Sequence, residues 1–223
     1  VDTMILAVAA TEIEMQPFLA EFAGDASSCL TLVTGVGPVE TAVCLTRFLC
    51  LLEQPVEAVV NFGIGGAYLQ PAGSKQPALL DLCLAEQEVL GDFGISLPDE
   101  IVPLDRSLTG EIMYSLGGEL LEAGQRLLES HGLVCHTGVF ITVNGVSGTL
   151  CRGEMLRARW QGICENMEGA AVARVCREFS LPCLELRAVS NYVEDRQPAS
   201  WRLHEACREA GRAAALIIKG LSV

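Results

Sequence analysis

Basic residues are scarce in this chain. Its 15 Lys and Arg residues stand against 28 Asp and Glu, which gives a formal net charge of −13. Nucleic acids and acidic membrane surfaces both require a positive footprint on the protein that binds them. The charge therefore argues against both partners, whereas a small anionic substrate needs only one local arginine.

Long hydrophobic runs are also missing, although 50% of the residues are hydrophobic. A membrane-spanning helix needs roughly 18 unbroken apolar residues. The best stretch, 42–62, is interrupted by Arg47, Glu53, Gln54, Pro55 and Glu57. No basic residue precedes Arg47, so the N-terminus does not have the pattern of a secretory signal. We expect neither a membrane span nor membrane binding.

Histidine is rare, and no two cysteines have the Cys-x-x-Cys spacing. The chain has 3 His and 10 Cys, and Cys135-His136 is the sole Cys–His neighbour pair. One such pair cannot complete a zinc site, so we expect no metal. Six cysteines lie in apolar patterns, where thiols act as small buried hydrophobes: Cys44, Cys50, Cys83, Cys164, Cys176 and Cys183. We therefore expect a reducing, cytoplasmic setting.

Short β-rich runs alternate with helical patterns along the chain. The patterns predict strands at 4–10, 30–34, 56–62, 79–90, 133–143 and 183–189, and helices at 11–22, 39–52, 111–130 and 201–221 with Ser200 as the last N-cap. This alternation predicts an α/β fold with a mainly parallel or mixed central sheet. We interpret 1–223 as a single domain, with active-site loops at 63–77, 91–110 and 190–199.

Two glycine-rich turns follow predicted strands, at Gly35-Val36-Gly37 and Gly63-Ile64-Gly65-Gly66. Such turns let backbone N–H groups approach an anion or a ligand edge. Neither is a dinucleotide fingerprint, because Glu40 occupies the place of the third glycine. This argues against a cofactor-binding oxidoreductase.

Two carboxylates and one amide stand out chemically. Glu14 has the spacing of a capping box with Thr11, and it also follows a strand, where a carboxylate can polarise a water. Glu168 opens a predicted helix and can accept two hydrogen bonds from a ribose diol. Asn191 follows an apolar strand, either as an ordinary turn residue or as an amide for the edge of a 6-oxopurine.

The order of these motifs resembles the purine nucleoside phosphorylase/nucleosidase superfamily, close to the methylthioadenosine/adenosylhomocysteine nucleosidases. The resemblance rests on 10–14, 35–37, 61–66, 165–170 and 187–191 and extends over nearly the whole chain. Asn191 stands where the adenine-specific enzymes have Asp, and Ile64 where they commonly have Ser. The runs 190–196, 200–202 and 91–94 resemble the futalosine hydrolases within this superfamily.

The resemblance implies a three-layer α/β/α, nucleoside phosphorylase-like fold, no cofactor and a homo-oligomer of two or more subunits. It implies hydrolysis of the N-glycosidic bond of futalosine, which releases hypoxanthine on a route to menaquinone. Glu14 would then be the general base, Glu168 the ribose ligand and Asn191 the group that stabilises the departing base. The other residues expected to bind substrate are Met167, Gly66, Ile64, Arg196, Tyr192 and Trp201, the last three at the aryl tail.

Several alternatives remain open on the sequence. The nearest is a nucleosidase for methylthioadenosine, adenosylhomocysteine or inosine. A phosphorylase is disfavoured because Glu14 would repel phosphate and no Lys or Arg precedes Arg47. A non-catalytic ligand-binding module is disfavoured by the presence of both Glu14 and Glu168.

Overall fold

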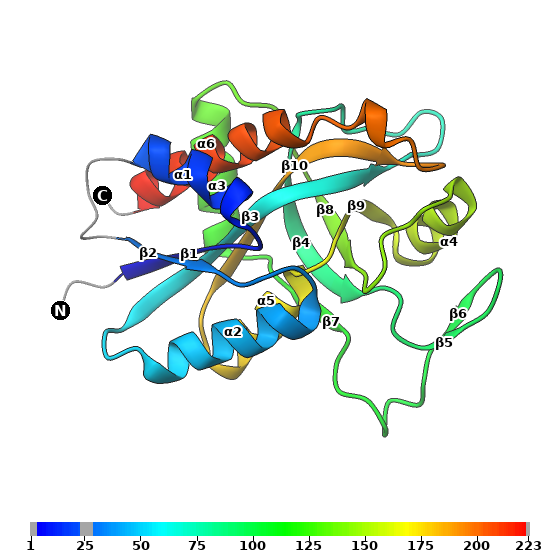
Figure 1. Cartoon of the computed structure of the whole chain (residues 1–223), viewed down its shortest axis with the longest axis horizontal. Helices are drawn as coiled ribbons and strands as arrows, with labels where there is room; N and C mark the ends of the chain where they lie inside the picture. Colours follow the sequence, from blue (N-terminus) through cyan, green and yellow to red (C-terminus); the bar gives the residue numbers. More distant parts are fainter. Residues whose placement is uncertain (1–3, 23–28, 222–223) are drawn as a thin grey trace.

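The strands of the molecule form one large sheet and one small hairpin (Figure 1). The computed structural model describes residues 4–22 and 29–221. The strands are β1 (Met4–Ala9), β2 (Cys29–Val33), β3 (Val56–Tyr68), β4 (Leu82–Leu90), β5 (Ile95–Ser96), β6 (Ile101–Val102), β7 (Met113–Ser115), β8 (Cys135–Thr142), β9 (Gly162–Asn166) and β10 (Cys183–Val193). The helices are α1 (Glu12–Phe22), α2 (Pro38–Leu51), α3 (Glu119–Ser130), α4 (Leu150–Trp160), α5 (Gly169–Glu178) and α6 (Leu203–Leu221), with a 3₁₀ turn at Pro198–Ser200.

The main sheet is mixed, as the sequence predicted. Strand β3 pairs parallel with β1 and β10 but antiparallel with β9. Strand β4 pairs parallel with β8 but antiparallel with β10, and β8 pairs parallel with β9. These pairings close β3, β9, β8, β4 and β10 into a ring, while β1 and β2 extend the sheet outward from β3. Polar groups on β3, β9 and β10 are thereby brought side by side.

Helices cover both faces of the sheet (Figure 1). On one face α6 packs against α1 and α3, over a core that contains Phe18, Phe62 and Ile217. On the other face α2 packs against α5, over a core that contains Leu45 and Val172. Apolar burial on both faces stabilises the sheet by roughly 25 cal/mol for each Å² removed from water.

The structure corrects several predicted boundaries. β3 continues through the glycine run to Tyr68, because its far half pairs with β9 and β10. Residues 113–115 form β7 instead of helix, since Tyr114 buries its side chain beside β4, and α3 begins only at Glu119. The last helix begins at Leu203, so Ser200 ends the 3₁₀ turn and does not cap α6.

Besides the small β5–β6 hairpin and the 3₁₀ turn, helix α4 and strand β9 escaped the sequence analysis altogether. Helix α4 is rich in charge and carries little apolar periodicity, yet Thr149 caps it by accepting a hydrogen bond from the backbone N–H of Arg152 at 3.3 Å. Strand β9 is short and contains Glu165 and Asn166, polar residues that are uncommon in a buried strand. Both elements lie next to the site described below.

The cysteines form no disulfide, and all ten are free thiols. Cys83, Cys164, Cys176 and Cys183 are buried as predicted, but Cys44 is half-buried and Cys50 is exposed. Both lie on α2, whose outer side also exposes Val39 and Val43. The apolar pattern of this helix therefore extends beyond the face that the sheet covers.

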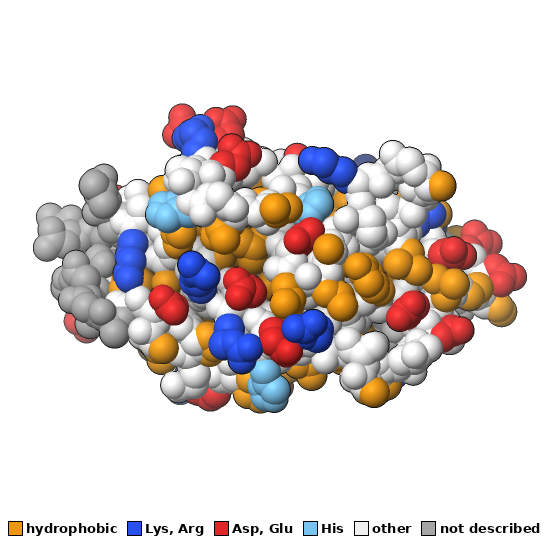
Figure 2. Space-filling model, turned by 90° about the horizontal axis from the view of Figure 1, so that it is seen from above, with side chains coloured by type: hydrophobic (Ala, Val, Ile, Leu, Met, Phe, Trp, Pro, Cys, Tyr) orange, Lys and Arg blue, Asp and Glu red, His pale blue; other side chains and the backbone are white. Residues whose placement is uncertain are grey.

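The surface mixes charges of both signs. On the face seen from above in Figure 2, acidic and basic side chains are interspersed, and hydrophobic side chains form a band across the middle. No helix in the described ranges is long and apolar enough to cross a membrane.

Candidate active site

A cavity of about 320 Å³ opens where β1, β3, β9 and β10 bring polar residues together. Its lining includes Thr11, Glu14, Ile64, Gly66, Val146, Ser147, Glu165, Asn166, Met167, Glu168, Arg187, Ser190, Asn191, Trp201 and His204. Ligands of open α/β sheets bind in such places, beyond the carboxyl ends of strands. A second hollow of about 800 Å³ lies beside α3, but its charged residues, Glu119 and Arg177, are both exposed. The chemistry therefore belongs to the smaller cavity.

Glu14 acts both as a helix cap and as a wall of the cavity. Its Oε2 accepts hydrogen bonds from the backbone N–H of Thr11 at 3.1 Å and from the Thr11 hydroxyl at 2.8 Å. Its Oε1 accepts one from the backbone N–H of Ile64 at 3.0 Å. Gly63 makes this approach possible, since a Cβ there would come within 2.4 Å of Oε1. One oxygen is thus fixed by the cap, and the other lies at the strand, with a lone pair left for a water.

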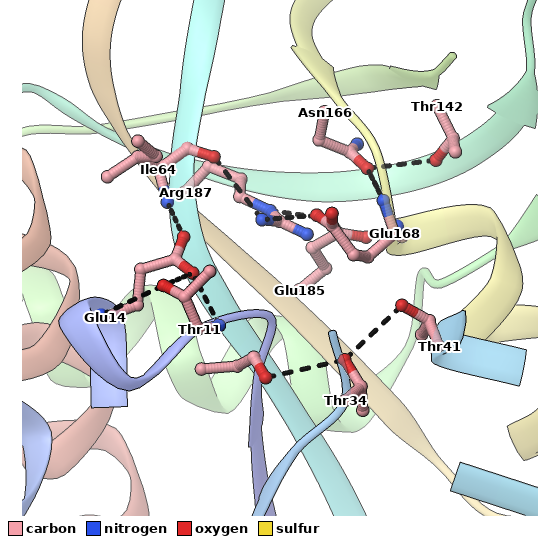
Figure 3. A network of polar contacts seen from close by, with 12 residues as sticks. Thr11, Glu14, Thr34, Thr41, Ile64, Thr142, Asn166, Glu168, Glu185 and Arg187 are labelled. Atoms are coloured by element: carbon pink, nitrogen blue, oxygen red, sulfur yellow. Dashed lines mark hydrogen bonds and ion pairs between the residues drawn. The ribbon is translucent and has the colours of Figure 1, made fainter. Parts of the chain in front are cut away.

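Arg187 is the centre of the buried charge (Figure 3). Its Nε donates to Glu185 Oε1 at 2.9 Å, and its Nη1 lies 3.2 Å from Glu168 Oε2. Burial by itself lowers the pKa of Arg187, but Glu185, Glu168 and Glu14 outweigh that effect and raise it above its usual value. Arg187 is therefore a permanent cation, only 1% exposed, held by acidic neighbours.

The second terminal nitrogen of Arg187 remains available. Nη2 is buried and has no hydrogen-bond partner within the described part of the chain. A buried charged donor without a partner is costly. Because Arg187 lines the cavity, this N–H group is well suited to an oxygen of a water or a ligand.

Glu168 is held from two sides at the start of α5. Its Oε1 accepts a hydrogen bond from the backbone N–H of Gly37 at 3.1 Å, and its Oε2 pairs with Arg187. The backbone N–H of Glu168 donates to Asn166 Oδ1 at 2.9 Å. As predicted, Glu168 precedes the first residue of a helix, where the dipole favours its charge.

A second pair of carboxyl groups lies behind this cluster, away from the cavity. Glu88 and Glu185 are 0% and 1% exposed and hydrogen-bond each other, which requires a proton on one of them. Burial, followed by the charge of Glu185, raises the pKa of Glu88 well above its ordinary value. Burial also raises the pKa of Glu185, but Arg187 and the hydrogen bond with Glu88 oppose that rise and favour the ionised form of Glu185. We therefore assign the shared proton to Glu88.

The opposite end of the cavity holds a carboxylate and an amide among hydroxyl groups. Glu165 accepts hydrogen bonds from the hydroxyls of Tyr68 at 2.9 Å and Ser147 at 2.6 Å, and from the backbone N–H of Ser147 at 2.8 Å. Asn191 Oδ1 accepts from the Ser190 hydroxyl at 2.8 Å, and its Nδ2 donates to the carbonyl oxygen of Tyr192 at 3.0 Å. The second N–H of the Asn191 amide has no acceptor among the described residues.

Seven of the nine residues predicted for the site line this cavity: Glu14, Ile64, Gly66, Met167, Glu168, Asn191 and Trp201. Asn191 lies within β10, beside a register shift, and does not follow the strand as the sequence suggested. Arg196 and Tyr192 lie outside the lining. Arg196 stacks over the Trp201 ring at 4.6 Å from its centroid, and Tyr192 packs against the core beneath α2 and α5.

The sequence analysis gave no role to Arg187, Glu185 or Glu165. A signal was present for the first two, because Glu185 and Arg187 alternate with apolar residues in Cys183–Val193. Residues two apart in a strand share a face, so opposite charges there indicate a buried ion pair. No group of three His, Cys, Asp or Glu residues in the described ranges has the arrangement of a metal site.

Residues 23–222 match the family model of the phosphorylase superfamily, and the chain therefore belongs to this superfamily. Among curated relatives it is 36% identical over 192 residues to the futalosine hydrolase of Thermus thermophilus, covering 82% of this chain and 77% of that protein. It is 34% identical over 181 residues to the futalosine hydrolase of Streptomyces coelicolor, covering 78% of this chain and 72% of that protein.

The fold is shared with solved nucleosidase structures. The 5′-methylthioadenosine/S-adenosylhomocysteine nucleosidase of Helicobacter pylori superposes with a TM-score of 0.84 at 20% identity, over 97% of this chain and 98% of that one. The three-layer nucleoside phosphorylase-like architecture predicted from the sequence is thus confirmed.

Proposed function

We propose that this protein hydrolyses the N-glycosidic bond of futalosine and releases hypoxanthine. The observation that carries the proposal is the grouping of Glu14, Glu168 and Arg187 in one cavity that also holds Asn191. The two futalosine hydrolases at 36% and 34% identity support the choice of substrate. Hydrolysis of this kind passes through an oxocarbenium-like state, which needs an activated water and a stabilised sugar cation.

Glu14 is the proposed general base. Its Oε2 is fixed by Thr11, and its Oε1 has capacity beyond the bond from Ile64 to accept a proton from water. Arg187 Nη2 is the natural second contact for that water, since it is a buried donor without a partner in the described structure. A positioned general base contributes roughly 10²- to 10⁴-fold to such a rate.

Glu168 is the proposed ribose ligand. Each of its oxygens already has one donor, from Gly37 or Arg187, and keeps a lone pair for a sugar hydroxyl. Its charge also stabilises the positive charge that develops on the sugar ring. Met167 and Ile64 line the cavity nearby and supply apolar walls for the sugar.

Water is a better nucleophile here than phosphate. Arg187 is already paired with Glu185 and Glu168 and is influenced by Glu14, so these carboxylates already compensate its positive charge. A phosphate anion entering beside Glu14 and Glu168 would meet repulsion at close range in a water-poor cavity. We therefore propose a hydrolase and not a phosphorylase.

The aryl tail of futalosine is proposed to reach Trp201 and Arg196. Trp201 lines the cavity and the exposed Arg196 stacks over its ring, so we place an exit from the cavity at this pair. An arginine there can bind the carboxylate of the tail. Tyr192 packs into the core and supports this strand without contributing to the cavity lining. Replacing Arg196 by Ala should raise the KM for futalosine, and an unchanged KM would refute the contact.

One assay tests the proposal. Futalosine, inosine, methylthioadenosine and adenosylhomocysteine are each incubated with the protein, with and without phosphate, and the free base is measured. We expect hypoxanthine from futalosine alone, at a rate that does not depend on phosphate. Release of adenine, or a requirement for phosphate, would overturn it.

A nucleosidase for methylthioadenosine or adenosylhomocysteine is the second candidate. The fold shared with such an enzyme from Helicobacter pylori favours it. So does the chemistry of asparagine, since an amide can pair with N6 and N7 of adenine. The same assay separates the two candidates.

We also propose that residues 1–223 form one nucleosidase domain that acts in the cytoplasm, in menaquinone biosynthesis, as a homo-oligomer. The exposed side chains of Ile13, Val36, Val146 and Leu203 at the cavity lining support the last point, since a second subunit would cover them. Native mass spectrometry tests the assembly, and a monomer at micromolar concentration would contradict it.

A further inference from the structure

Glu165 is a buried carboxylate in the cavity to which the proposed reaction assigns no task. It is 5% exposed, lines the cavity and lies on β9, at the end opposite Glu14. Buried carboxylates are costly unless they are hydrogen-bonded. The surroundings of Glu165 meet this requirement, since three donors converge on it.

The donors leave one acceptor position of Glu165 unused. Oε2 takes the hydroxyl hydrogen bonds of Tyr68 and Ser147, which fill its two lone pairs. Oε1 takes the backbone N–H of Ser147 alone among the described residues. Oε1 therefore keeps one lone pair, and a carboxylate fixed in this way can accept a hydrogen bond but cannot offer one.

The sheet brings Glu165 and Asn191 to the same place from opposite sides. Gly66 on β3 pairs with Glu165 on β9 and with Asn191 on β10. Neighbouring strands are about 4.8 Å apart, so the Cα atoms of Glu165 and Asn191 lie on either side of Gly66, at roughly twice that distance from each other. A Cβ at Gly66 would lie 2.9 Å from Val193 Cγ2 and 3.3 Å from Asn191 Nδ2, so a larger residue would displace both side chains. Gly66, Glu165 and Asn191 all line the cavity, so the two side chains reach it from the strands on either side of a residue that has no side chain.

Asn191 by itself does not choose between purines. Its free N–H can donate to N7, which is an acceptor in both adenine and hypoxanthine. The two bases differ at C6, where hypoxanthine carries an oxygen and adenine an amino group, and at N1, where hypoxanthine carries a hydrogen and adenine a lone pair. A hydrogen-bond acceptor placed at N1 therefore distinguishes them.

We propose that Glu165 is a specificity-determining residue whose Oε1 accepts a hydrogen bond from N1–H of a 6-oxopurine. The inference rests on the proposed function and extends it, because it names the group that selects the base. An adenine in the same position would bring its N1 lone pair against the carboxylate and leave both acceptors unpaired. Sites built in this way reject the wrong partner by repulsion and desolvation as well as by a missing bond.

A purely structural role for Glu165 makes a different prediction. In that case the carboxylate would only hold Ser147 and the segment before α4 in place. Its loss would then lower activity on all purine nucleosides alike. The ratio of kcat/KM for a 6-oxo and a 6-amino substrate distinguishes the two roles. A loss of activity that is common to both substrates cancels in this ratio.

The test compares futalosine with its 6-amino counterpart, as kcat/KM, in the wild type, Glu165→Gln and Glu165→Met. Methionine removes every acceptor, whereas glutamine keeps an acceptor oxygen without the charge. The preference for the 6-oxo substrate should fall by roughly 10- to 150-fold in Glu165→Met, the value of a hydrogen bond to a charged group. Glu165→Gln should lie between Glu165→Met and the wild type.

Product inhibition provides a second readout that does not depend on the chemical step. Hypoxanthine should inhibit the wild type more strongly than adenine does, and the difference should shrink in Glu165→Met. The matched control is Tyr68→Phe, which removes a donor from Oε2 but leaves Oε1 as it is. This variant should keep the base preference whatever it does to thermal stability.

The outcomes separate the inference from the function on which it rests. If the wild type cleaves futalosine and Glu165→Met retains the wild-type preference, the inference is wrong and the proposed function stands. Equal losses on both substrates would make Glu165 structural and also refute the inference. If the wild type does not cleave futalosine, both proposals fail.

Discussion

The two ends of the cavity are built on different principles. At the sugar end, Glu14, Glu168 and Glu185 surround the cation Arg187, with Glu88 behind them. At the base end, Glu165 is held by hydroxyl and backbone groups, and the amide of Asn191 is held by Ser190 and by the carbonyl of Tyr192.

Because of this difference, single residues can be substituted at the base end but not at the sugar end. Charges at the sugar end depend on one another, since removing one leaves the others buried without compensation. Hydrogen bonds at the base end are local, and changing one residue there leaves the rest of the end in place. Proteins with this fold can therefore keep the same sugar site and differ in the purine that they accept.

The largest effect should come from Arg187→Met, which tests the interdependence of the sugar end. Leaving Glu185 and Glu168 without their cation should cost about 3–5 kcal/mol of unfolding free energy and abolish turnover. Urea denaturation measures the first and hypoxanthine release the second. Arg174→Met is the matched control, because Arg174 pairs with Glu178 at the surface and its loss should cost less than about 1 kcal/mol. Equal stabilities of the two variants would contradict the interdependence.

Glu14→Gln should lower kcat by roughly 10²- to 10⁴-fold while the fold remains intact. The amide still accepts a hydrogen bond from Thr11, so the cap survives, but it takes up no proton from water. Steady-state kinetics and thermal melting provide the two readouts. Glu12→Gln is the control, since Glu12 is exposed in the same helical turn and lies outside the cavity. Retained activity in Glu14→Gln would reduce Glu14 to a cap.

Asn191→Asp adds a second carboxyl group to the base end, beside Glu165. A carboxylate has no N–H for the base and adds a charge in the same cavity as Glu165, so kcat/KM for futalosine should fall roughly 10- to 150-fold at neutral pH. Protonation restores a donor, and activity relative to the wild type should therefore rise as the pH falls. A flat ratio across pH, with no loss at neutral pH, would show that the amide does not touch the base.

The sequence predicted those features of the two ends of the cavity that depend only on the order of residues along the chain. Glu14 and Asn191 each stand near the end of an apolar strand pattern, and Glu168 opens an apolar helix pattern. Side chains at such places gather at one edge of an α/β sheet. The strand and helix alternation gave the mixed sheet for the same reason. Positions along the chain were enough for these features.

The remaining features depend on contacts between distant segments. The glycine run 63–66 looks like a turn from its composition, but pairing with β9 and β10 extends it as strand. Tyr192 follows Asn191 in an extended strand, so its side chain points to the opposite face and leaves the cavity. The role of Glu165 depends on its register with Gly66, which no local pattern reveals.

The smallest effect on turnover should come from Glu88→Gln, which changes the supporting layer and not the cavity. Burial, followed by the charge of Glu185, raises the pKa of Glu88, so the folded state keeps a proton that the unfolded state releases above about pH 4.3. The wild type therefore loses stability as the pH rises from the ordinary glutamate range toward this raised pKa. Glutamine has no such proton to lose.

At about pH 5 the Glu88→Gln variant should be less stable than the wild type, because glutamine has one acceptor oxygen and cannot satisfy both Asn166, which donates to Oε1, and Thr142, which donates to Oε2. The difference in unfolding free energy should narrow toward about pH 8, because the protonated Glu88 stabilises the wild type less as the pH rises. Urea denaturation at both pH values measures it. A difference that does not change with pH would mean that Glu88 is ionised in the fold. The sugar end would then carry one more negative charge than it does when Glu88 is protonated.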